Sequence, residues 1–195
     1  MSVELHPDPI QQFQDWHAAI IATGQYAEPT AMTLATVGVD HTPDARIVLL
    51  KKVDDSGFYF VTNYQSSKGR AIAANPRVAA VFYWDGSEQQ VRIRGHAETA
   101  DRAFSEAYFA SRSRKSQLGA WASAQSTVLD DPMMLHQRVA DADKRFSDIP
   151  CPDHWGGYRI VPNEIEFWIG QPHRLHDRFL YTKQGDRWVI TRLNP

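Results

Sequence analysis

The feature that most constrains the fold is a series of short apolar segments of strand length, each separated from the next by a turn sequence. Turns such as Asp54-Asp55-Ser56-Gly57 and Asp85-Gly86-Ser87 favour hairpins, in which neighbouring strands run antiparallel. The pattern predicts about eight strands. The segments that fit it are 31–37, 46–53, 58–63, 78–84, 88–97, 158–161, 164–169, 178–183 and 188–193.

Helical patterns lie before and between these strands. Asp8-Pro9 is a typical helix start, apolar residues follow it at helical spacing, and Gly24 can end that helix. Further helices are expected at 66–75, 100–111, 116–122 and 132–146, with a linker at 148–153. Short antiparallel strands with helices between them predict a mainly β fold of the α+β class, in which helices pack outside a small barrel.

The composition fits a single domain that spans residues 1–195, because 43% of the residues are hydrophobic. The net charge of −2 gives no general attraction to nucleic acids or membranes. No apolar run approaches the ~20 residues of a membrane helix, and the N-terminus has no signal-peptide pattern. Cys151 is the single cysteine, so a disulfide within the chain is excluded. We expect a cytoplasmic protein without nucleic-acid or membrane partners.

Positively charged residues are grouped near the C-terminus in a way that favours an anion. If residues 174–178 are extended, Arg174, His176 and Arg178 lie on one face, and Leu175 and Asp177 lie on the other. Three potentially cationic groups on one face suit an anion. A solvated edge strand is the alternative, because charged runs usually face water.

Two further groups of charged residues lie earlier in the chain. Ser66-Ser67-Lys68-Gly69 begins a helix after a strand, where free backbone N–H groups, hydroxyls and a lysine favour a phosphate. An ordinary serine cap is the alternative. Arg46 and Lys51 lie at the two ends of an apolar segment, and a regular strand would place them on opposite faces. They share a site only if a bulge intervenes or the site surrounds the strand end.

A second candidate phosphate site follows the strands. Tyr108, Arg112 and Ser116 are spaced by four residues, so a continuous helix would align them in one stripe that suits a phosphate monoester. A polar helix end is the alternative. Gln90 shares a strand face with two arginines, and its amide could bond the edge of a heterocycle. The eight histidines form no recognised metal motif, and no metal is expected. Two phosphate pockets without a metal suggest a phosphorylated cofactor that faces a phosphorylated substrate.

Several sequence runs occur in order from about Pro7 to the C-terminus. They are Arg46-Ile-Val-Leu-Leu-Lys51, Gln90-Val-Arg, Tyr108-Phe-Ala-Ser-Arg112, Ser116-Gln-Leu-Gly-Ala-Trp121, Gln125-Ser126, Ile165-Glu-Phe-Trp168, Arg174-Leu-His-Asp-Arg178 and Trp188…Arg192-Leu193-x-Pro195. Together they resemble the pyridoxine/pyridoxamine 5′-phosphate oxidase family. The resemblance implies an FMN-binding split β-barrel, completed by residues 158–195. It also implies a homodimer with FMN at the subunit interface.

The resemblance further implies that O₂ oxidises pyridoxine 5′-phosphate, pyridoxamine 5′-phosphate or both to pyridoxal 5′-phosphate, with H₂O₂ as the second product. The implied FMN contacts are Arg46, Ile47, Val48, Leu49, Leu50, Lys51, Val61, Thr62, Ser67, Lys68, Gln90, Gln125, Ser126, Trp168 and Arg178. The implied substrate contacts are Lys51, Tyr108, Arg112 and Ser116 at the phosphate, and Arg174, Leu175 and His176 at the pyridine ring. Arg174 and His176 are the expected catalytic residues, which orient the substrate for hydride transfer from C4′ to flavin N5.

The chain departs from the family pattern at three places. Val61 stands where an aromatic residue is usual, and Ser67 stands where an arginine is usual. The lost arginine would weaken FMN binding by about 1–2 kcal/mol. No basic stretch that could close over the site precedes His6. Residues 1–6 are expected to be flexible.

Two alternative functions remain open. A phenazine-pathway flavin oxidase shares the fold and the cofactor, but its substrates carry no phosphate that would occupy the predicted phosphate set. A non-catalytic split-barrel module would bind flavin, haem or pyridoxal phosphate as a carrier or sensor. Such a module has no need for Arg174 and His176 together beside a phosphate set.

Overall fold

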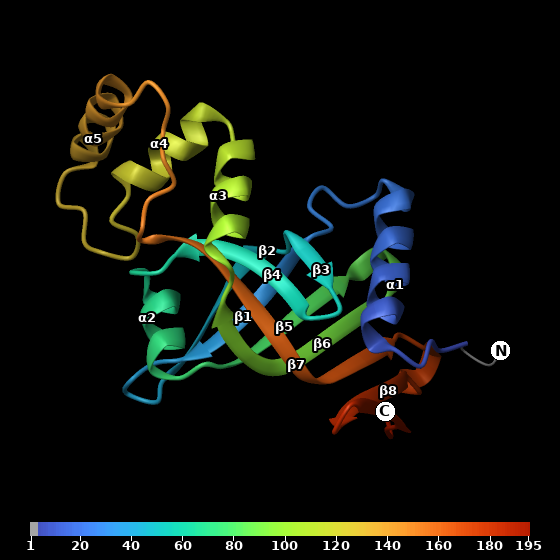
Figure 1. Ribbon diagram of the computed structural model, residues 1–195. Coiled ribbons are helices and arrows are strands. Elements are labelled where there is room, and N and C mark those ends of the chain that lie inside the picture. Colours follow the sequence, from blue (N-terminus) through green and yellow to red (C-terminus); the bar gives the residue numbers. More distant parts are fainter. Residues whose placement is uncertain (1–3) are drawn as a thin grey trace.

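The structure is a computed structural model that describes residues 4–195. Within these residues the chain forms five α-helices and nine strands (Figure 1). The helices are α1 (Pro9–Thr23), α2 (Ser67–Ala74), α3 (Arg102–Ser111), α4 (Arg114–Ala122) and α5 (Pro132–Arg145). The strands are β1 (Ala31–Val37), β2 (Pro43–Leu49), β3 (Lys52–Asp54), β4 (Gly57–Asn63), β5 (Arg77–Trp84), β6 (Gln89–Thr99), β7 (Trp155–Ile169), β8 (Asp177–Gln184) and β9 (Arg187–Arg192).

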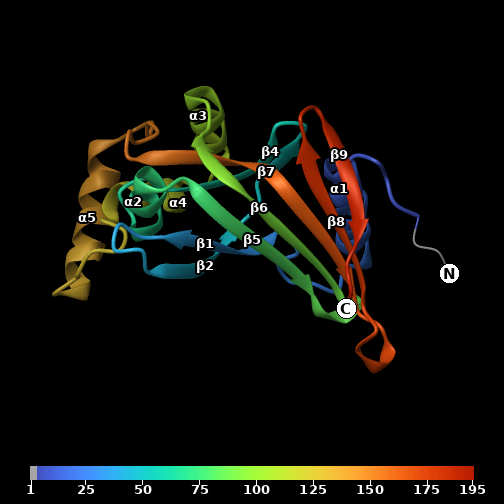
Figure 2. The same cartoon turned by 90° about the horizontal axis from the view of Figure 1, so that it is seen from below.

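All of these strands belong to one antiparallel sheet in the order β2-β1-β5-β6-β7-β4-β3, while β8 pairs with β7 and β9 pairs with β8. The central element is β7, which pairs with β6 over most of its length. Its first part also pairs with β4, and its last part pairs with β8. The sheet curls, α1 packs near one end, and α2, α4 and α5 lie at the other end (Figures 1 and 2). The predicted mainly β architecture with helices packed outside is confirmed.

The core lies inside the curl of the sheet and combines aliphatic residues with several large aromatic ones. Phe13 of α1 is fully buried, and its ring lies 4.9 Å from Phe58 and 5.0 Å from Phe82, measured between ring centroids. Burying one such side chain stabilises the fold by about 1.5–3 kcal/mol. The predicted limits of α1 are confirmed, because Asp8 accepts the Ile10 N–H and Gly24 adopts the left-handed conformation that ends the helix.

Two predicted strand boundaries are wrong. The predicted strand 46–53 divides into β2 and β3, because the N–H of Leu50 bonds to Thr30 and that of Lys51 bonds to Tyr59. The predicted strands 158–161 and 164–169 are instead one strand, β7. Pro162 cannot donate a ladder hydrogen bond, but it lies opposite Gly95 at a shift in register, where the strand tolerates it.

Tyr108, Arg112 and Ser116 do not form one helical stripe, because the chain forms two helices here, as the predicted segments 100–111 and 116–122 imply. Arg112 follows the last turn of α3 in an extended conformation, and Ser113 caps α4 by accepting the N–H of Ser116 at 3.3 Å. Serine competes well for a helix N-cap, so a second helix begins there. The three residues therefore reach a common region from two helices.

The segment before β8 is not extended, so the condition for alternating faces along residues 174–178 is not met. Residues Pro172–Arg174 form a short 3₁₀ turn in which His173 and Arg174 have left-handed φ angles of 59° and 63°. The strand begins only at Asp177. Arg174, His176 and Arg178 are consequently not aligned on one face of a strand.

The N-terminal segment is visible from residue 4 onwards. The predicted flexibility of residues 1–6 falls partly on residues 1–3, which lie outside the described residues. Leu5 packs against the core, and the hydroxyl of Tyr181 donates a hydrogen bond to the carbonyl of His6 at 2.8 Å. No helix within residues 4–195 is long and apolar enough to cross a membrane.

Two helical glycines give a matched test of packing. A Cβ atom at Gly69 would lie 2.1 Å from the carbonyl oxygen of Tyr64, whereas one at Gly119 would have no atom within 4 Å. We expect Gly69→Ala to lower the free energy of unfolding by about 1–3 kcal/mol, because the backbone must shift. We expect Gly119→Ala to raise it by about 0.5–1 kcal/mol, because alanine favours the helix. Urea unfolding of both variants measures the difference, and equal effects would contradict the packing argument.

Candidate active site

Lys68 is a buried ammonium without an acidic partner in the described part of the chain. It lies in the first turn of α2, is 7% exposed, and donates to the Thr62 hydroxyl at 3.3 Å. Burial lowers its pKa, and the neighbouring charge of Arg46 lowers it further. A buried cation of this kind is costly unless an anion compensates it. The location therefore fits an anionic ligand.

Arg46 provides a second positive charge beside Lys68. Its guanidinium donates to the Thr36 hydroxyl at 2.8 Å and to the Leu34 carbonyl at 3.2 Å, which fixes it across β1. Asp44 pairs with the same guanidinium and neutralises part of its charge. The backbone N–H groups at the start of α2 add a favourable field for an anion. Two cations and a helix terminus together can hold a phosphate.

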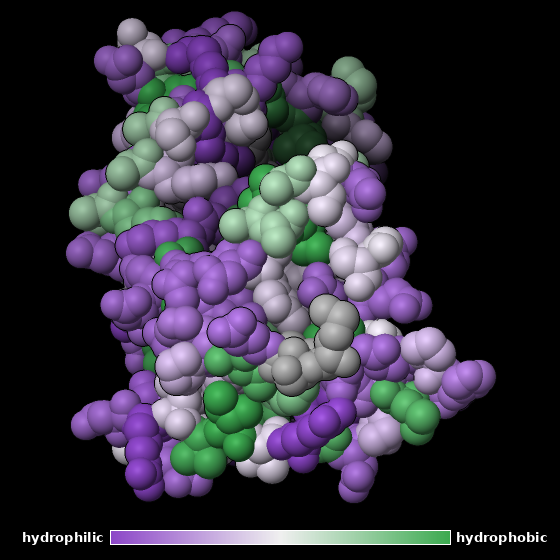
Figure 3. Space-filling view, turned by 90° about the vertical axis from the view of Figure 1, so that its right-hand side faces the viewer, coloured by the Kyte–Doolittle hydropathy of each residue, from purple (hydrophilic) through white to green (hydrophobic). Residues whose placement is uncertain are grey.

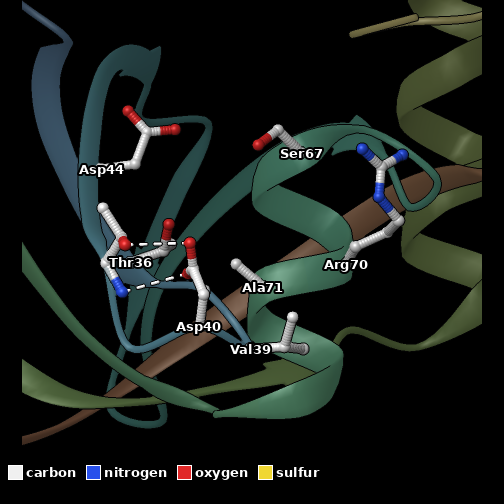
Figure 4. Close-up of a pocket in the computed structure, with 9 residues that line it drawn as sticks. Thr36, Val39, Asp40, Asp44, Ser67, Arg70 and Ala71 are labelled. Atoms are coloured by element: carbon white, nitrogen blue, oxygen red, sulfur yellow. Dashed lines mark hydrogen bonds between the residues drawn. The ribbon is translucent and has the colours of Figure 1, made fainter.

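A cavity of about 320 Å³ lies beside this pair of cations, between the β1–β2 turn and α2. Thr36 and Asp44, which both bond to Arg46, line it together with Ser67. Figure 4 shows Ser67 and Asp44 at the same edge of this cavity, while the guanidinium of Arg70 lies on the far side of Ser67. Ser67 is thus placed to offer a hydroxyl near the cations, although it cannot replace a charge.

A second cationic region is built on two stacked aromatic rings. The rings of Tyr108 and Trp155 are nearly parallel, with centroids 6.3 Å apart. The Nζ atom of Lys51 lies 5.6 Å from the Tyr108 centroid, and the guanidinium carbon of Arg112 lies 4.8 Å from the Trp155 centroid. The break between β2 and β3 brings Lys51 to this region, and the break between α3 and α4 frees Arg112 to reach it.

Arg112 faces a cavity of about 310 Å³. Its Nη1 atom is buried without a hydrogen-bond partner, and burial lowers the pKa of the guanidinium. Ser116 and Gln125 line the same cavity, as does Asn63, which the sequence patterns did not single out. Ser126 follows in a left-handed conformation, with φ at 69°. An unpaired, partly desolvated arginine beside hydroxyl and amide groups suits the phosphate of a small ligand.

A third group of predicted residues lies near the end of β7. Gln90, Trp168 and Arg178 are neighbours across β6, β7 and β8, so they form one row. The ring of His176 lies 4.6 Å from that of Trp168. The Gln171 N–H donates to Nδ1 of His176 at 3.1 Å, so a neutral His176 carries its proton on Nε2.

Glu166 organises this third group and was missed by sequence reasoning. Its buried carboxylate accepts a hydrogen bond from Nε of Arg178 at 2.7 Å and another from Nη1 of Arg92 at 2.9 Å. The bond with Glu166 raises the pKa of Arg178, and the Asn194 carbonyl accepts Nη1 of Arg178 at 3.2 Å. The alternation of side chains along β7 places Glu166 on the face opposite to Ile165 and Phe167. Its two partners, Arg92 and Arg178, lie on neighbouring strands, so only the register between the strands reveals them.

Arg174 and Leu175 are exposed beside His176. They belong to the end of the molecule that carries α1 and the C-terminal strands, which Figure 3 views directly. That surface is mainly hydrophilic, with separate apolar patches in its lower part. The side chain of Leu175 is 68% exposed, which leaves it free to contact a ligand or another chain.

The other predicted cofactor residues differ in which way their side chains point. Val48 and Leu50 are buried in the core, so a ligand could reach only their backbone. Ile47 points outward and is 62% exposed. Leu49 and Val61 are partly exposed. The segment from Arg46 to Lys51 can therefore offer backbone groups and its terminal cations more readily than its central side chains.

The predicted residues form two half-sites at opposite ends of β7. Half-site one contains Arg46, Lys51, Thr62, Ser67, Lys68, Tyr108, Arg112, Ser116, Gln125 and Ser126, and half-site two contains Gln90, Trp168, Arg174, Leu175, His176 and Arg178. Thr62 pairs with Gly156, which lies twelve residues before Trp168. At a rise of about 3.3 Å per residue, about 40 Å of strand separates the two groups. Figures 1 and 2 both place β8 far from α2 and α4. One chain therefore does not bring the two half-sites together.

Two family models match the chain. The model described as pyridoxamine 5′-phosphate oxidase matches residues 21–145. The model described as the pyridoxine 5′-phosphate oxidase C-terminal dimerisation region matches residues 155–195. Proteins named pyridoxine/pyridoxamine 5′-phosphate oxidase are similar along nearly the whole length. One from Thermosynechococcus vestitus is 52% identical over 96% of this chain and 89% of its own, and one from Burkholderia multivorans is 51% identical over 97% and 90%.

Solved structures also resemble this fold. PhzG from Burkholderia lata, in complex with tetrahydrophenazine-1-carboxylic acid, superposes with a TM-score of 0.91 at 30% identity and covers 97% of this chain and 94% of its own. A pyridoxamine 5′-phosphate oxidase-related, FMN-binding protein from Nostoc punctiforme gives a TM-score of 0.75 at 18% identity and covers both chains fully. These likenesses confirm the predicted split-barrel fold.

The buried charge of Lys68 gives a test that needs no enzymatic assay. We expect Lys68→Met to raise the free energy of unfolding of the ligand-free protein by about 1–2 kcal/mol, because an apolar side chain removes an uncompensated buried charge. Folding lowers the pKa of Lys68 below its ordinary value of 10.5. The wild type therefore gains stability relative to the variant as the pH rises from neutral toward that value.

Urea unfolding at several pH values, with and without inorganic phosphate, measures these effects. Phosphate should stabilise the wild type, and it should stabilise Lys68→Met less, because only the site at Arg112 then remains to bind it. Lys115→Met, at an exposed position on α4, is the control and should change neither quantity. A less stable Lys68→Met variant that still responds fully to phosphate would exclude Lys68 as an anion ligand.

Proposed function

Because the chain belongs to the pyridoxamine 5′-phosphate oxidase family, we propose that it oxidises pyridoxine 5′-phosphate, pyridoxamine 5′-phosphate or both to pyridoxal 5′-phosphate. FMN is the proposed cofactor, and O₂ is the proposed acceptor, which is reduced to H₂O₂. The cytoplasm is the expected location. The observation that carries the proposal is the partly buried Arg112, which lines a cavity together with Ser116 and whose Nη1 atom has no hydrogen-bond partner.

The residues of half-site one fit a cofactor that carries a phosphate. Lys68 and Arg46 would hold that phosphate, and the Ser67 hydroxyl and the N-terminus of α2 would assist them. An anion at this position would relieve the repulsion between the two cations and compensate the burial of Lys68. Gln90, Trp168 and Arg178 of half-site two would bind the other parts of the cofactor.

When bound, FMN supplies the redox chemistry, namely acceptance of a hydride from C4′ of the substrate and return of two electrons to O₂. The protein supplies placement. Lys51, Tyr108, Arg112 and Ser116 would bind the substrate phosphate, which is remote from C4′. Binding energy gained there can fix the position of the reacting carbon.

Arg174 and His176 would orient the pyridine ring of the substrate. His176 carries its proton on Nε2 when neutral, so it can donate a hydrogen bond to an oxygen or nitrogen of the ring system. Arg174 is exposed in a left-handed conformation that other contacts of the turn must hold. A cationic group at this position favours negative charge that develops near it.

A homodimer would unite the two half-sites. About 40 Å of β7 separates them in one chain, and residues 155–195 match a dimerisation region. A two-fold axis would place half-site one of each chain against half-site two of the other, which gives two equivalent sites. This arrangement agrees with the expectation that FMN lies at the subunit interface.

A phenazine-pathway oxidase is the second candidate, and the structural likeness to PhzG favours it. The ligand of PhzG is a carboxylic acid. In this chain, one carboxylate would then have to pair with both Arg112 and Lys51. The phosphate set of Lys51, Tyr108, Arg112 and Ser116 provides more positive charge and more donors than a single carboxylate needs. We therefore rank the oxidase of phosphorylated B6 vitamers first.

Oxygen consumption by the FMN-loaded protein tests the proposed activity. We expect turnover with both phosphorylated vitamers and an increase of about 10–100-fold in KM for Arg112→Ala, because a charged hydrogen bond worth about 1.5–3 kcal/mol is lost. Lys115→Ala removes a nearby exposed charge and should leave KM unchanged. Bound flavin without turnover would favour a carrier, and turnover of tetrahydrophenazine-1-carboxylic acid that is insensitive to Arg112→Ala would favour the phenazine pathway.

Mixing two impaired variants, assayed at a substrate concentration far below the raised KM of Arg112→Ala, tests the shared site. Arg112→Ala weakens half-site one and Arg174→Ala weakens half-site two, so each homodimer has no intact site. Random exchange of subunits should restore about a quarter of the wild-type activity, because half of the dimers are hybrids with one intact site each. A mixture of Arg112→Ala with Lys51→Ala, which lie in the same half-site, should show no recovery. Equal recovery in both mixtures would exclude a site shared between chains.

A further inference from the structure

Trp155 is the first residue of β7 and is held rigidly at the base of the Arg112 cavity. Its side chain is 5% exposed, and its backbone pairs with Asn63. Arg102 fixes the segment before it by donating to the carbonyls of Cys151 at 2.6 Å, Pro152 at 3.1 Å and Trp155 at 3.4 Å. The position of the indole is thus set by backbone contacts on both sides.

The indole contacts two aromatic rings and a cation. Tyr108 stacks on it at an interplanar angle of 11°, and the ring of Phe109 contacts it edge-on at 5.2 Å. The Arg112 guanidinium lies over it at 4.8 Å. Lys51 lies 5.6 Å from the Tyr108 ring, which also stacks on Phe104. Each of the two stacked rings, Tyr108 and Trp155, therefore has one cation close to it.

Holding an arginine on a ring differs from holding it on a carboxylate. Arg178 is paired with Glu166, which it shares with Arg92, and Arg114 is paired with Asp143, so each of these positive charges is at least partly offset. Arg112 makes no salt bridge within residues 4–195, and its Nη1 atom has no hydrogen-bond partner. The electron-rich face of an indole attracts a guanidinium and leaves its charge and its N–H donors available.

We propose that Trp155 is a positioning residue that holds Arg112 toward the cavity while leaving its charge for a phosphate group. The inference rests on the proposed function insofar as that phosphate belongs to the substrate. It predicts that Trp155 acts on affinity for the phosphate, through Arg112, and not on the oxidation step. It also makes the stack of Lys51, Tyr108, Trp155 and Arg112 the element that selects phosphorylated ligands.

The test uses the FMN-loaded protein and two measurements. Steady-state oxygen consumption gives KM and kcat for pyridoxine 5′-phosphate, and calorimetry gives the Kd of inorganic phosphate without turnover. We expect Trp155→Leu to raise both KM and the phosphate Kd by about tenfold, with kcat changed less than about threefold. Trp155→Phe keeps an aromatic ring beneath Arg112, so it should retain most of the affinity for phosphate. It keeps the test valid if Trp155→Leu fails to fold.

Trp121→Phe is the matched control. Trp121 also lies beneath an arginine, with the guanidinium carbon of Arg145 5.8 Å from its ring, but it is not among the residues that line the Arg112 cavity. We expect this variant to leave KM and the phosphate Kd unchanged. If Trp121→Phe and Trp155→Leu have equal effects, a general loss of packing explains both, and the inference is wrong.

The Arg112→Ala background separates a positioning role from a direct one. If Trp155 acts through Arg112, then adding Trp155→Leu to Arg112→Ala should change the phosphate Kd less than about twofold. A further tenfold loss would overturn the inference. Failure of the proposed function can be distinguished from failure of the inference. A protein without oxidase activity whose phosphate Kd still depends on Trp155 and Arg112 would refute the oxidase function and support the inference. An active oxidase with an unchanged Kd in Trp155→Leu would refute the inference alone.

Discussion

The pairing of β7 with three other strands is the constraint on which the rest of the structure depends. One end of β7 pairs with β4 and presents Trp155 beside Arg112, and the other end pairs with β8 and presents Trp168 beside Arg178. Fifteen residues of continuous strand keep these ends apart. About 40 Å of strand lies between them, so the strand that positions both half-sites also separates them within one chain.

The charges of the two half-sites are balanced in different ways. In half-site two, Glu166 accepts hydrogen bonds from both Arg92 and Arg178, so it offsets part of the charge of Arg178 and fixes its direction. In half-site one, the buried Lys68 and the partly buried Arg112 make no salt bridge within the described residues, and folding tolerates the cost of their desolvation. Unpaired cations of this kind are rare in protein interiors. Their presence in two separate places supports the proposal that the chain binds two anionic groups, one near α2 and one between α3 and α4.

Much of the fold could be predicted from the sequence, because local signals determine it. The cap at Asp8, the terminating Gly24 and the turn sequences act within a few residues, and they placed α1 and most strands correctly. The errors arise where distant partners decide. Pro162 continues in β7 only because Gly95 opposes it at a register shift. Ser113 is a local signal that a spacing argument overlooked, since a serine can begin a new helix in the middle of an apparent stripe.

The candidate site residues also divide into those that the sequence reveals and those that only the fold reveals. The residue types that bind a phosphate are visible in the sequence as Arg, Lys, Ser and Tyr at suggestive spacings. The groups that orient them are not visible, because Trp155 and Glu166 reach their arginines across strands and helices. Arg112 and Arg178 have the same chemistry in the sequence, yet Arg112 lies over an indole that leaves its charge unpaired, while Arg178 is paired with a carboxylate that offsets part of its charge. What each arginine can bind is therefore decided by its neighbour in space, and only the folded chain reveals which neighbour that is.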